Sequence, residues 1–124
     1  MIYLHSPNLR ERLIAHLREL SDLEYQKRYW KVIDEETGNY DEFDYSVHFL
    51  YDDTDLAYDP DSYIGCTLYS QEEAECVRKL ATALDIVFEV NGLELDDHEY
   101  LSTKEWPLVL RAAAEALSVI EKKP

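Results

Sequence analysis

The stretch SQEEAECVRKLATALDIVFEVNG, residues 70–92, decides the fold class of this chain. Ser70 and Glu73 have capping-box spacing, in which each side chain bonds the other residue's free backbone N–H at a helix N-terminus. Gly92 is a typical residue for the end of a helix. The segment therefore predicts a long helix that buries one wide apolar stripe, made of Val77, Leu80, Ala81, Leu84, Val87 and Phe88.

Two further helices are indicated near the two ends of the chain. Ser6 is a candidate N-cap, Pro7 suits the first helical position, and leucines follow at helical spacing. Near the C-terminus, Thr103 is a candidate N-cap and Pro107 falls in the first turn, where its missing N–H is tolerated. The last helix is expected to bury Trp106, Val109, Leu110, Ala113, Leu117 and Ile120.

Shorter elements are expected between these helices. Ser21 and Glu24 repeat the capping-box spacing and predict a second helix. Its apolar face is expected to comprise Tyr25, Tyr29 or Trp30, and Val32 or Ile33. Gly38 and Asn39 then indicate a loop. A short helical turn is expected at residues 96–101.

Residues 43–51 fit two kinds of secondary structure. Apolar side chains recur there at helical spacing, but aromatic and polar residues also alternate as in a half-buried strand. The Tyr, Phe and Val content favours the strand. We expect the helix, because an isolated strand leaves its backbone groups unpaired and only residues 63–69 offer a partner.

These patterns predict an all-α fold, a single domain over residues 1–124 with about five helices. The alternative left open is a minor short-strand element near residues 43–51 and 63–69. Hydrophobic residues make up 46% of the chain, which excludes a disordered acidic tail. The absence of a secretory-signal pattern and of a long apolar run leads us to expect a cytoplasmic protein with Cys66 and Cys76 reduced.

The charge of the chain is large and unevenly distributed. There are 27 Asp and Glu against 12 Lys and Arg, a net charge of −15, which disfavours direct binding to nucleic acid or to an anionic membrane. Residues 32–77 hold 14 acidic residues and no Lys or Arg, and residues 80–103 hold six more. The first 31 residues, in contrast, contain six basic and four acidic residues.

Aromatic residues, mostly tyrosines, are interleaved with the acidic run. Tyrosine is common at interface hot spots, and complementary charge raises association rates and selects partners. The run therefore predicts a surface for a basic protein partner, and the alternative is a solvated acidic face that promotes solubility. The candidate contact residues are Asp52, Asp53, Asp55, Tyr58, Asp59, Asp61 and Tyr63, with a flanking patch of Glu35, Glu36, Asp41 and Glu42.

The sequence offers little support for catalysis or metal binding. An EF-hand register fails at Asp53 and at Asp59, because the sixth position is Tyr58 or Ile64 and not glycine. No zinc-protease histidine pattern, phosphate loop or nucleophile elbow is present. The run at residues 96–99, Asp-Asp-His-Glu, is interpreted as a solvated turn in preference to a metal site. We expect a non-enzyme with no cofactor and no metal, and a carboxylate-rich metal-dependent hydrolase is the weakest alternative.

The segment Val47-His48-Phe49-Leu50-Tyr51-Asp52-Asp53-Thr54 resembles one found in small, acidic, uncharacterised bacterial proteins. The same proteins are similar to this chain at Ile64-Gly65, Ala83-Leu84-Asp85, Tyr100-Leu101 and Trp106-Pro107. The resemblance runs from near Asp41 to Ile120 and implies no catalytic residues. In size and charge the chain also resembles immunity proteins that neutralise bacterial toxins, in type and not in motif.

The expected function is therefore that of a cytosolic immunity protein. Its acidic and aromatic side chains would occlude the active site of a basic toxin, a nuclease domain. The alternative is a small regulatory or structural module that binds a partner through an apolar groove, with the acidity serving solubility. Salt dependence distinguishes the two, since only charge-driven binding weakens strongly with ionic strength.

Overall fold

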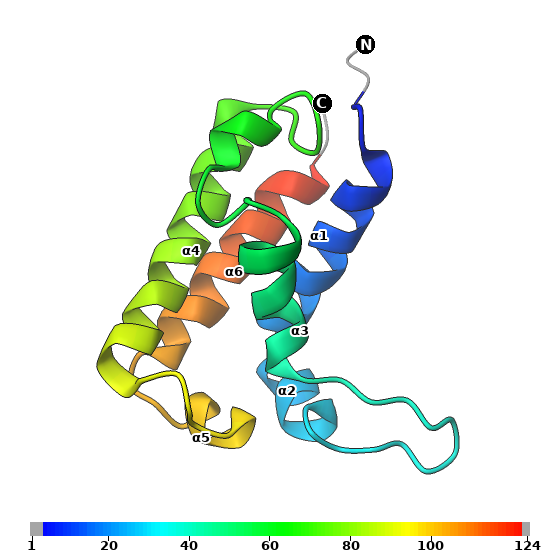
Figure 1. Ribbon diagram of the computed structural model, residues 1–124, viewed down its shortest axis with the longest axis vertical. Coiled ribbons are helices and arrows are strands. Elements are labelled where there is room, and N and C mark those ends of the chain that lie inside the picture. The colour runs from blue at the N-terminus through cyan, green and yellow to red at the C-terminus, as the bar shows by residue number, and fades with distance from the viewer. Residues whose placement is uncertain (1–3, 123–124) are drawn as a thin grey trace.

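Three long helices build the core of the protein. They are α1 (Pro7–Leu20), α4 (Gln71–Asn91) and α6 (Trp106–Glu121), and α6 packs against both of the others (Figure 1). The structure, a computed structural model, describes residues 4–122. The predicted all-α fold class is confirmed, and the long helix expected at residues 70–92 lies where the sequence indicates it.

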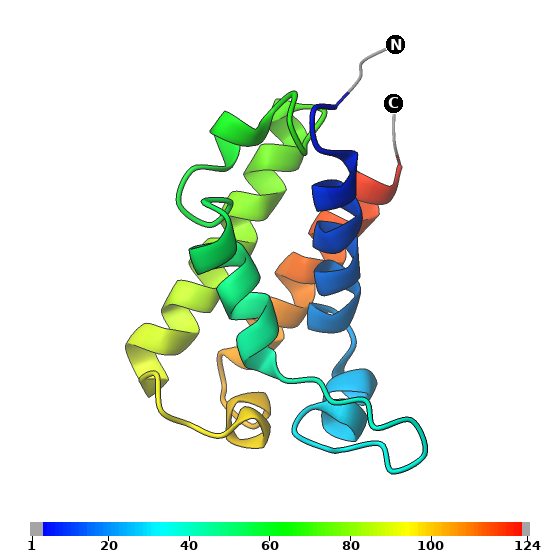
Figure 2. The same cartoon turned by 45° about the vertical axis from the view of Figure 1, so that its right-hand side comes forward.

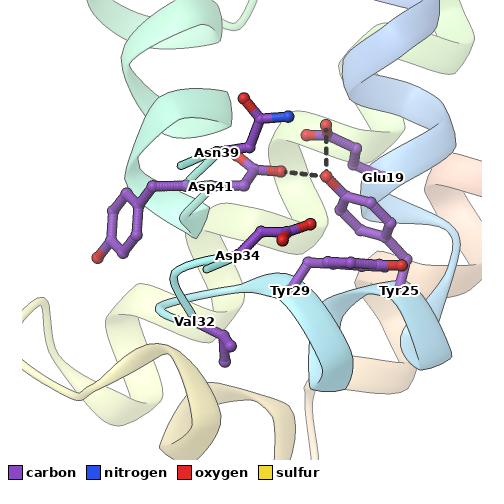
Figure 3. Close-up of a pocket in the computed structure, with 8 residues that line it drawn as sticks. Glu19, Tyr25, Tyr29, Val32, Asp34, Asn39 and Asp41 are labelled. Atoms are coloured by element: carbon purple, nitrogen blue, oxygen red, sulfur yellow. Dashed lines mark hydrogen bonds between the residues drawn. The ribbon is translucent and has the colours of Figure 1, made fainter. Parts of the chain in front are cut away.

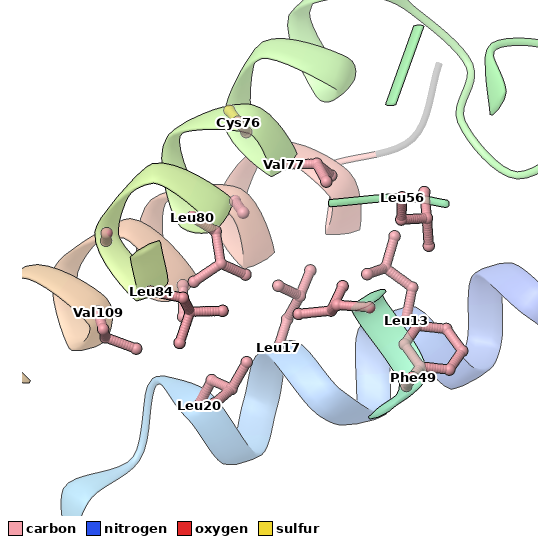
Figure 4. Close-up of a cluster of buried hydrophobic side chains, with 14 of the residues drawn as sticks. Leu13, Leu17, Leu20, Phe49, Leu56, Cys76, Val77, Leu80, Leu84 and Val109 are labelled. Atoms are coloured by element: carbon pink, nitrogen blue, oxygen red, sulfur yellow. The ribbon is translucent and has the colours of Figure 1, made fainter. Parts of the chain in front are cut away.

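The three helices bury their apolar stripes against one another. Figure 4 shows leucines of α1 facing α4 across this core, and each labelled side chain there is buried. The fully buried residues that α1 and α4 contribute to this core include Leu13, Leu17, Leu20, Leu80, Leu84 and Val87. From α6 come Trp106, Val109, Ala113, Ala116 and Ile120. Truncating one such leucine to alanine typically costs about 2–5 kcal/mol.

Shorter helices cover one side of this core. They are α2 (Leu23–Tyr29), α3 (Phe43–His48) and α5 (Asp97–Leu101), so residues 4–122 hold six α-helices where about five were predicted. A single π-helical turn, η1 (Phe49–Asp53), continues α3, and a 3₁₀ turn, η2 (Pro60–Tyr63), precedes α4.

The strand alternative for residues 43–51 and 63–69 is wrong. Within residues 4–122 the only β-type pairings are the isolated bridges Trp30–Asp41 and Ile64–Leu68. The segment from Phe43 is helical because Phe43, Phe49 and Leu50 all become buried when it winds onto the core. A strand would have placed Phe49 and Leu50 on opposite faces.

Both ends of α4 lie where the sequence predicts them. Ser70 Oγ accepts a hydrogen bond from the Glu73 N–H at 3.3 Å, and Gly92 closes the helix with φ +82°. The reciprocal half of the capping box is absent, because the Glu73 carboxylate accepts from the Tyr69 N–H at 2.8 Å instead. Ser6 precedes α1 as predicted, but its side chain makes no capping hydrogen bond.

Two predicted caps are wrong. Asp22, and not Ser21, caps α2 by accepting from the Tyr25 N–H at 3.1 Å. The last helix begins at Trp106 with Glu105 as N-cap, because the Thr103 hydroxyl instead donates to the Tyr100 carbonyl at 2.8 Å. Of the six residues expected on the buried face of α6, Leu110 and Leu117 are only half-buried.

A buried ion pair ties the three long helices together. Arg10 of α1 is 5% exposed and Glu73 of α4 is 3% exposed, and their side chains form two hydrogen bonds of 2.7 and 2.9 Å. Arg10 also donates to the Ile120 carbonyl in α6 at 2.7 Å and to the Thr67 carbonyl at 3.0 Å. This pair fixes the end of the bundle at which α4 begins.

None of the helices in residues 4–122 combines the length and the apolar character needed to cross a membrane.

Candidate functional site

The most prominent surface feature is the loop of residues 31–42, called the 31–42 loop. It projects from the body of the protein between α2 and α3 (Figures 1 and 2). Its neck is closed, because the Lys31 N–H donates to the Asp41 carbonyl at 2.9 Å and the Lys31 ammonium lies 3.5 Å from the Glu42 carboxylate. Compact loops whose ends meet in this way are frequently functional.

The residues flanking the loop are anchored in the core. Trp30 and Phe43 are buried, and their rings stack with centroids 5.3 Å apart. Trp106 contacts both rings edge-on, at 5.9 Å from Trp30 and 5.1 Å from Phe43. Both ends of the loop are therefore held by aromatic packing in the helical core.

Helix α5 holds the same two ends from the other side. The His98 Nε2–H donates to the Trp30 carbonyl at 2.9 Å, and the Asp97 carboxylate accepts from the Phe43 N–H at 2.9 Å. Burial raises the pKa of Asp97. The interpretation of residues 96–99 as a solvated turn is thus wrong for Asp97, which is buried where it supports the loop.

Hydrogen bonds within the loop hold it in one shape. The Asp34 N–H donates to the Asn39 carbonyl at 2.9 Å, and the Gly38 N–H donates to the Asp34 carbonyl at 2.7 Å. The Asp34 side chain accepts from the Glu36 N–H at 3.0 Å. Gly38 has φ +76°, a conformation that glycine adopts without strain. A loop ordered in this way loses little further entropy when it binds.

The buried apolar face predicted for residues 32 and 33 is wrong. α2 ends at Tyr29, and Lys31 turns the chain outward with φ +63°, the single left-handed non-glycine residue in residues 4–122. Val32 and Ile33 are consequently 44% and 65% exposed. The loop therefore presents apolar as well as acidic side chains.

A pocket of about 420 Å³ opens between the loop and helices α1 and α2. Figure 3 shows its carboxylates and tyrosine rings gathered around one space. Its volume lies within the ordinary range for ligand pockets, roughly 300–1,000 Å³. The pocket is lined by Glu19, Tyr25, Tyr29, Val32, Asp34, Asn39, Tyr40 and Asp41.

Two carboxyl groups meet at one tyrosine hydroxyl in this pocket. The Tyr25 hydroxyl lies 2.6 Å from Asp41 Oδ2 and 3.2 Å from Glu19 Oε1, the bonds drawn as dashed lines in Figure 3. Burial, followed by the nearby charge of Asp41, raises the pKa of Glu19 from 4.5 to about 7. Burial and hydrogen bonding to Asp41 likewise raise the pKa of Tyr25. Burial and the nearness of Asp41 therefore penalise a negative charge on Glu19.

The acidic segment of residues 52–63 has a different character. Several of its carboxylates pair with cations of the same chain: Asp53 with Arg12 at 3.8 Å and Asp61 with Arg78 at 2.9 Å. The Asp52 carboxylate lies 2.5 Å from His48 Nδ1. The contacts with Arg12 and Arg78 neutralise part of the negative charge that was expected to bind a basic partner.

The other predicted residues of this segment face the solvent to different degrees. Asp55, Tyr58 and Asp59 are exposed, whereas Tyr63 is half-buried and its hydroxyl accepts from the Asp55 N–H at 2.8 Å. Tyr58 is 70% exposed and packs edge-on against Tyr51.

The predicted contact residues do not form one patch. Glu35, Glu36, Asp41 and Glu42 belong to the 31–42 loop, whereas residues 52–63 run from the end of η1 to η2, which packs against α4 (Figures 1 and 2). The helical residues 43–51 lie between the two groups, which places Glu42 and Asp52 about 15 Å apart in helix rise. The loop residues therefore lie apart from residues 52–63, and contact of both groups with one partner stays a prediction.

Of the eight residues that line the pocket, only Asp41 is among the contact residues predicted from the sequence, and the missed ones include Glu19, Tyr25 and Asp34. Glu19 and Tyr25 lie on α1 and α2, in the part of the chain with mixed charge, and only the folded loop brings Asp41 to them. No spacing rule connects positions so far apart.

The described residues also lack a metal-binding cluster. No three His, Cys, Asp or Glu side chains within residues 4–122 are grouped closely enough to hold an ion.

Comparison with known proteins gives one match. The family model of a domain of unknown function, DUF7945, matches residues 4–124. No curated protein and no solved structure matches the chain. Because the family model spans nearly the whole sequence, this chain belongs to the DUF7945 family.

Proposed function

We propose that this protein binds a basic protein partner through the 31–42 loop. The observation that carries the proposal is the loop itself: it projects, it is held in one shape, and it joins exposed carboxylates to exposed apolar and tyrosine side chains. Preorganisation lowers the entropic cost of association, and carboxylates on a projecting surface steer a basic partner toward it.

The finer proposal is an immunity protein that neutralises a toxin nuclease. A nuclease binds phosphates with Lys and Arg, so an acidic loop complements its cleft and excludes the substrate. The small size, the net charge of −15 and the location of that charge support this proposal. The mechanism requires only occlusion, so no group of this chain needs to perform chemistry.

The first experiment identifies the partner and measures the effect of salt. The immobilised protein captures proteins from extracts of the source cells, and each captured protein is purified and titrated by calorimetry. We expect a partner with a basic surface, whose affinity falls about tenfold or more between 50 and 500 mM salt. For the toxin proposal, the protein must also inhibit the partner's nuclease activity at a 1:1 ratio. A partner bound equally well at both salt concentrations would contradict the charge-driven mechanism.

A matched pair of variants locates the surface. Glu35→Gln with Glu36→Gln removes two charges at the tip of the loop, and Asp55→Asn with Asp59→Asn removes two charges from the 52–63 segment. Both variants have the same net charge. We expect the loop variant to weaken binding about tenfold or more and the segment variant to change it little. Equal weakening would mean that binding responds to total charge and not to the loop.

One observation favours the alternative function, a regulatory or structural interaction module. Val90 and Leu93, at the end of α4 and just beyond it, are 63% and 76% exposed and offer an apolar surface. A partner bound there would be insensitive to salt. Leu93→Ser would weaken that partner and leave a loop-bound partner unaffected.

A further inference from the structure

We propose that the pocket behind the 31–42 loop receives an arginine side chain of the partner. This inference deepens the proposed function and rests on it. The pocket joins groups from three parts of the chain: Glu19 of α1, Tyr25 and Tyr29 of α2, and Asp34 and Asp41 of the loop.

The carboxylates of the pocket have no cation of their own. Among residues 4–122, no Lys or Arg lies within 4.0 Å of the carboxylates of Glu19, Asp34 or Asp41. A ring nitrogen of His16 lies 4.0 Å from Glu19, but burial, followed by the charge of Arg12, lowers the pKa of His16 and favours its neutral form. The 52–63 segment differs, because Arg12 and Arg78 neutralise part of it.

The aromatic walls define the kind of cation that fits. Tyr25 and Tyr29 lie with ring centroids 4.9 Å apart, and Figure 3 shows the ring of Tyr29 on one side of the pocket with Asp34 and Asp41 above it. A guanidinium is planar, stacks on aromatic rings and donates hydrogen bonds in its own plane. The pocket thus offers a ring surface for stacking and carboxylate oxygens for the N–H donors.

Other cations fit the pocket less well. A divalent metal needs several oxygens within about 2.0–2.6 Å of one point, and the described residues contain no such group. A lysine ammonium is compact and strongly hydrated, and it does not use a ring face as well as a guanidinium does. The volume of about 420 Å³ and the tyrosine walls therefore favour arginine.

The guanidinium of Arg28 already lies over the ring of Tyr29. Its carbon Cζ lies 5.5 Å from the centroid of the Tyr29 ring, although Arg28 does not line the pocket. The Tyr29 ring therefore already supports a guanidinium on its surface. A guanidinium from the partner would in addition meet the carboxylates that Arg28 does not contact.

The test uses a short peptide, so it does not depend on the partner. The ¹⁵N-labelled protein is titrated with acetyl-Gly-Arg-Gly-amide, followed by ¹H–¹⁵N correlation spectra. The same peptide with citrulline in place of arginine is the neutral control of equal shape. We expect saturable shifts at the amides of Tyr29, Asp34 and Asp41, and an affinity about tenfold higher than for the citrulline peptide.

Two variants with equal net charge make the test specific. Asp34→Asn removes a pocket charge but keeps an oxygen for the Glu36 N–H, so the loop keeps its shape. Glu36→Gln removes a charge outside the pocket. We expect Asp34→Asn to weaken the arginine peptide about fivefold or more and Glu36→Gln less than about twofold.

Several outcomes of the peptide titrations would overturn the proposal. They are equal affinity for the citrulline peptide, tighter binding of the matching lysine peptide, shifts confined to residues 52–63, and equal weakening by the two variants. Saturation of the same amides by Mg²⁺ or Ca²⁺ alone would also overturn it in favour of a metal site. Because Glu35 and Glu36 do not line the pocket, the loop-tip variant can still weaken a partner when the arginine proposal fails.

Discussion

Replacing Glu73 with glutamine is expected to cost the protein a large part of its stability. Oε1 of Glu73 accepts from Arg10 at 2.7 Å and from the Tyr69 N–H at 2.8 Å, and Oε2 accepts from Arg10 at 2.9 Å. Glutamine has a single oxygen, so in either amide orientation its NH₂ group faces another donor. The guanidinium of Arg10 is then buried without a countercharge.

The expected magnitude follows from the burial of the pair. The side chains of Arg10 and Glu73 are 6% and 4% exposed, and breaking a buried pair by removing one charge costs about 3–5 kcal/mol. That is a large fraction of the roughly 5–15 kcal/mol that stabilises a domain. For a chain of this length we expect the melting temperature to fall by about 10–20 °C.

Urea unfolding followed by circular dichroism at 222 nm measures the free energy of unfolding. The matched control is Glu115→Gln, which breaks the exposed pair between Lys79 and Glu115 at 3.3 Å. We expect it to cost less than about 1 kcal/mol, as exposed pairs do. If Glu73→Gln cost no more than Glu115→Gln, the reasoning from burial would be refuted.

Three further outcomes are expected. Below pH 4.5 the protonated Glu19 stabilises the fold, and this contribution is lost as the pH rises through about 7. Glu19→Gln should therefore flatten the dependence of the unfolding free energy on pH by about 1–2 kcal/mol between pH 5 and 8, after allowance for the partial exposure of Glu19. An unchanged slope would contradict the raised pKa. The Lys31→Gly variant should be about 1 kcal/mol more stable than Lys31→Ala, because both lose the ion pair but only glycine adopts the left-handed conformation of residue 31 without strain. The reverse order in urea unfolding would show that the backbone at residue 31 is not strained. Ser70→Ala should cost about 1 kcal/mol and Ser6→Ala less, because only Ser70 makes a capping hydrogen bond with its side chain, and equal costs in the same assay would rule this out.

The helices could be predicted from the sequence because their signals are local. The apolar stripe from Val77 to Phe88, the cap at Ser70 and the stop at Gly92 all lie within one segment, and α4 forms there. The end of α2 could not be predicted in the same way. Val32 and Ile33 continue the apolar pattern, but the left-handed Lys31 diverts the chain before they can join the helix.

The candidate site could be predicted only in part, because its geometry depends on long-range contacts. The acidic run predicted Glu35 and Asp41 as contact residues, and both lie in the 31–42 loop, but the prediction treated neighbours in sequence as neighbours in space. The helical residues 43–51 separate the two acidic groups, and Arg12 and Arg78, which are distant in sequence, neutralise part of the second group. The spacing of residues along the chain does not predict these ion pairs.

Amide hydrogen exchange of the protein, free and in complex with its basic partner, tests most directly whether the 31–42 loop is the binding surface. Mass spectrometry compares peptides covering residues 32–41 with peptides covering residues 52–61. We expect binding to slow exchange in residues 32–41 and to leave residues 52–61 nearly unchanged, since protection follows the contacts that the partner makes. Protection confined to residues 52–61, or to the exposed end of α4, would contradict the assignment of partner binding to the loop.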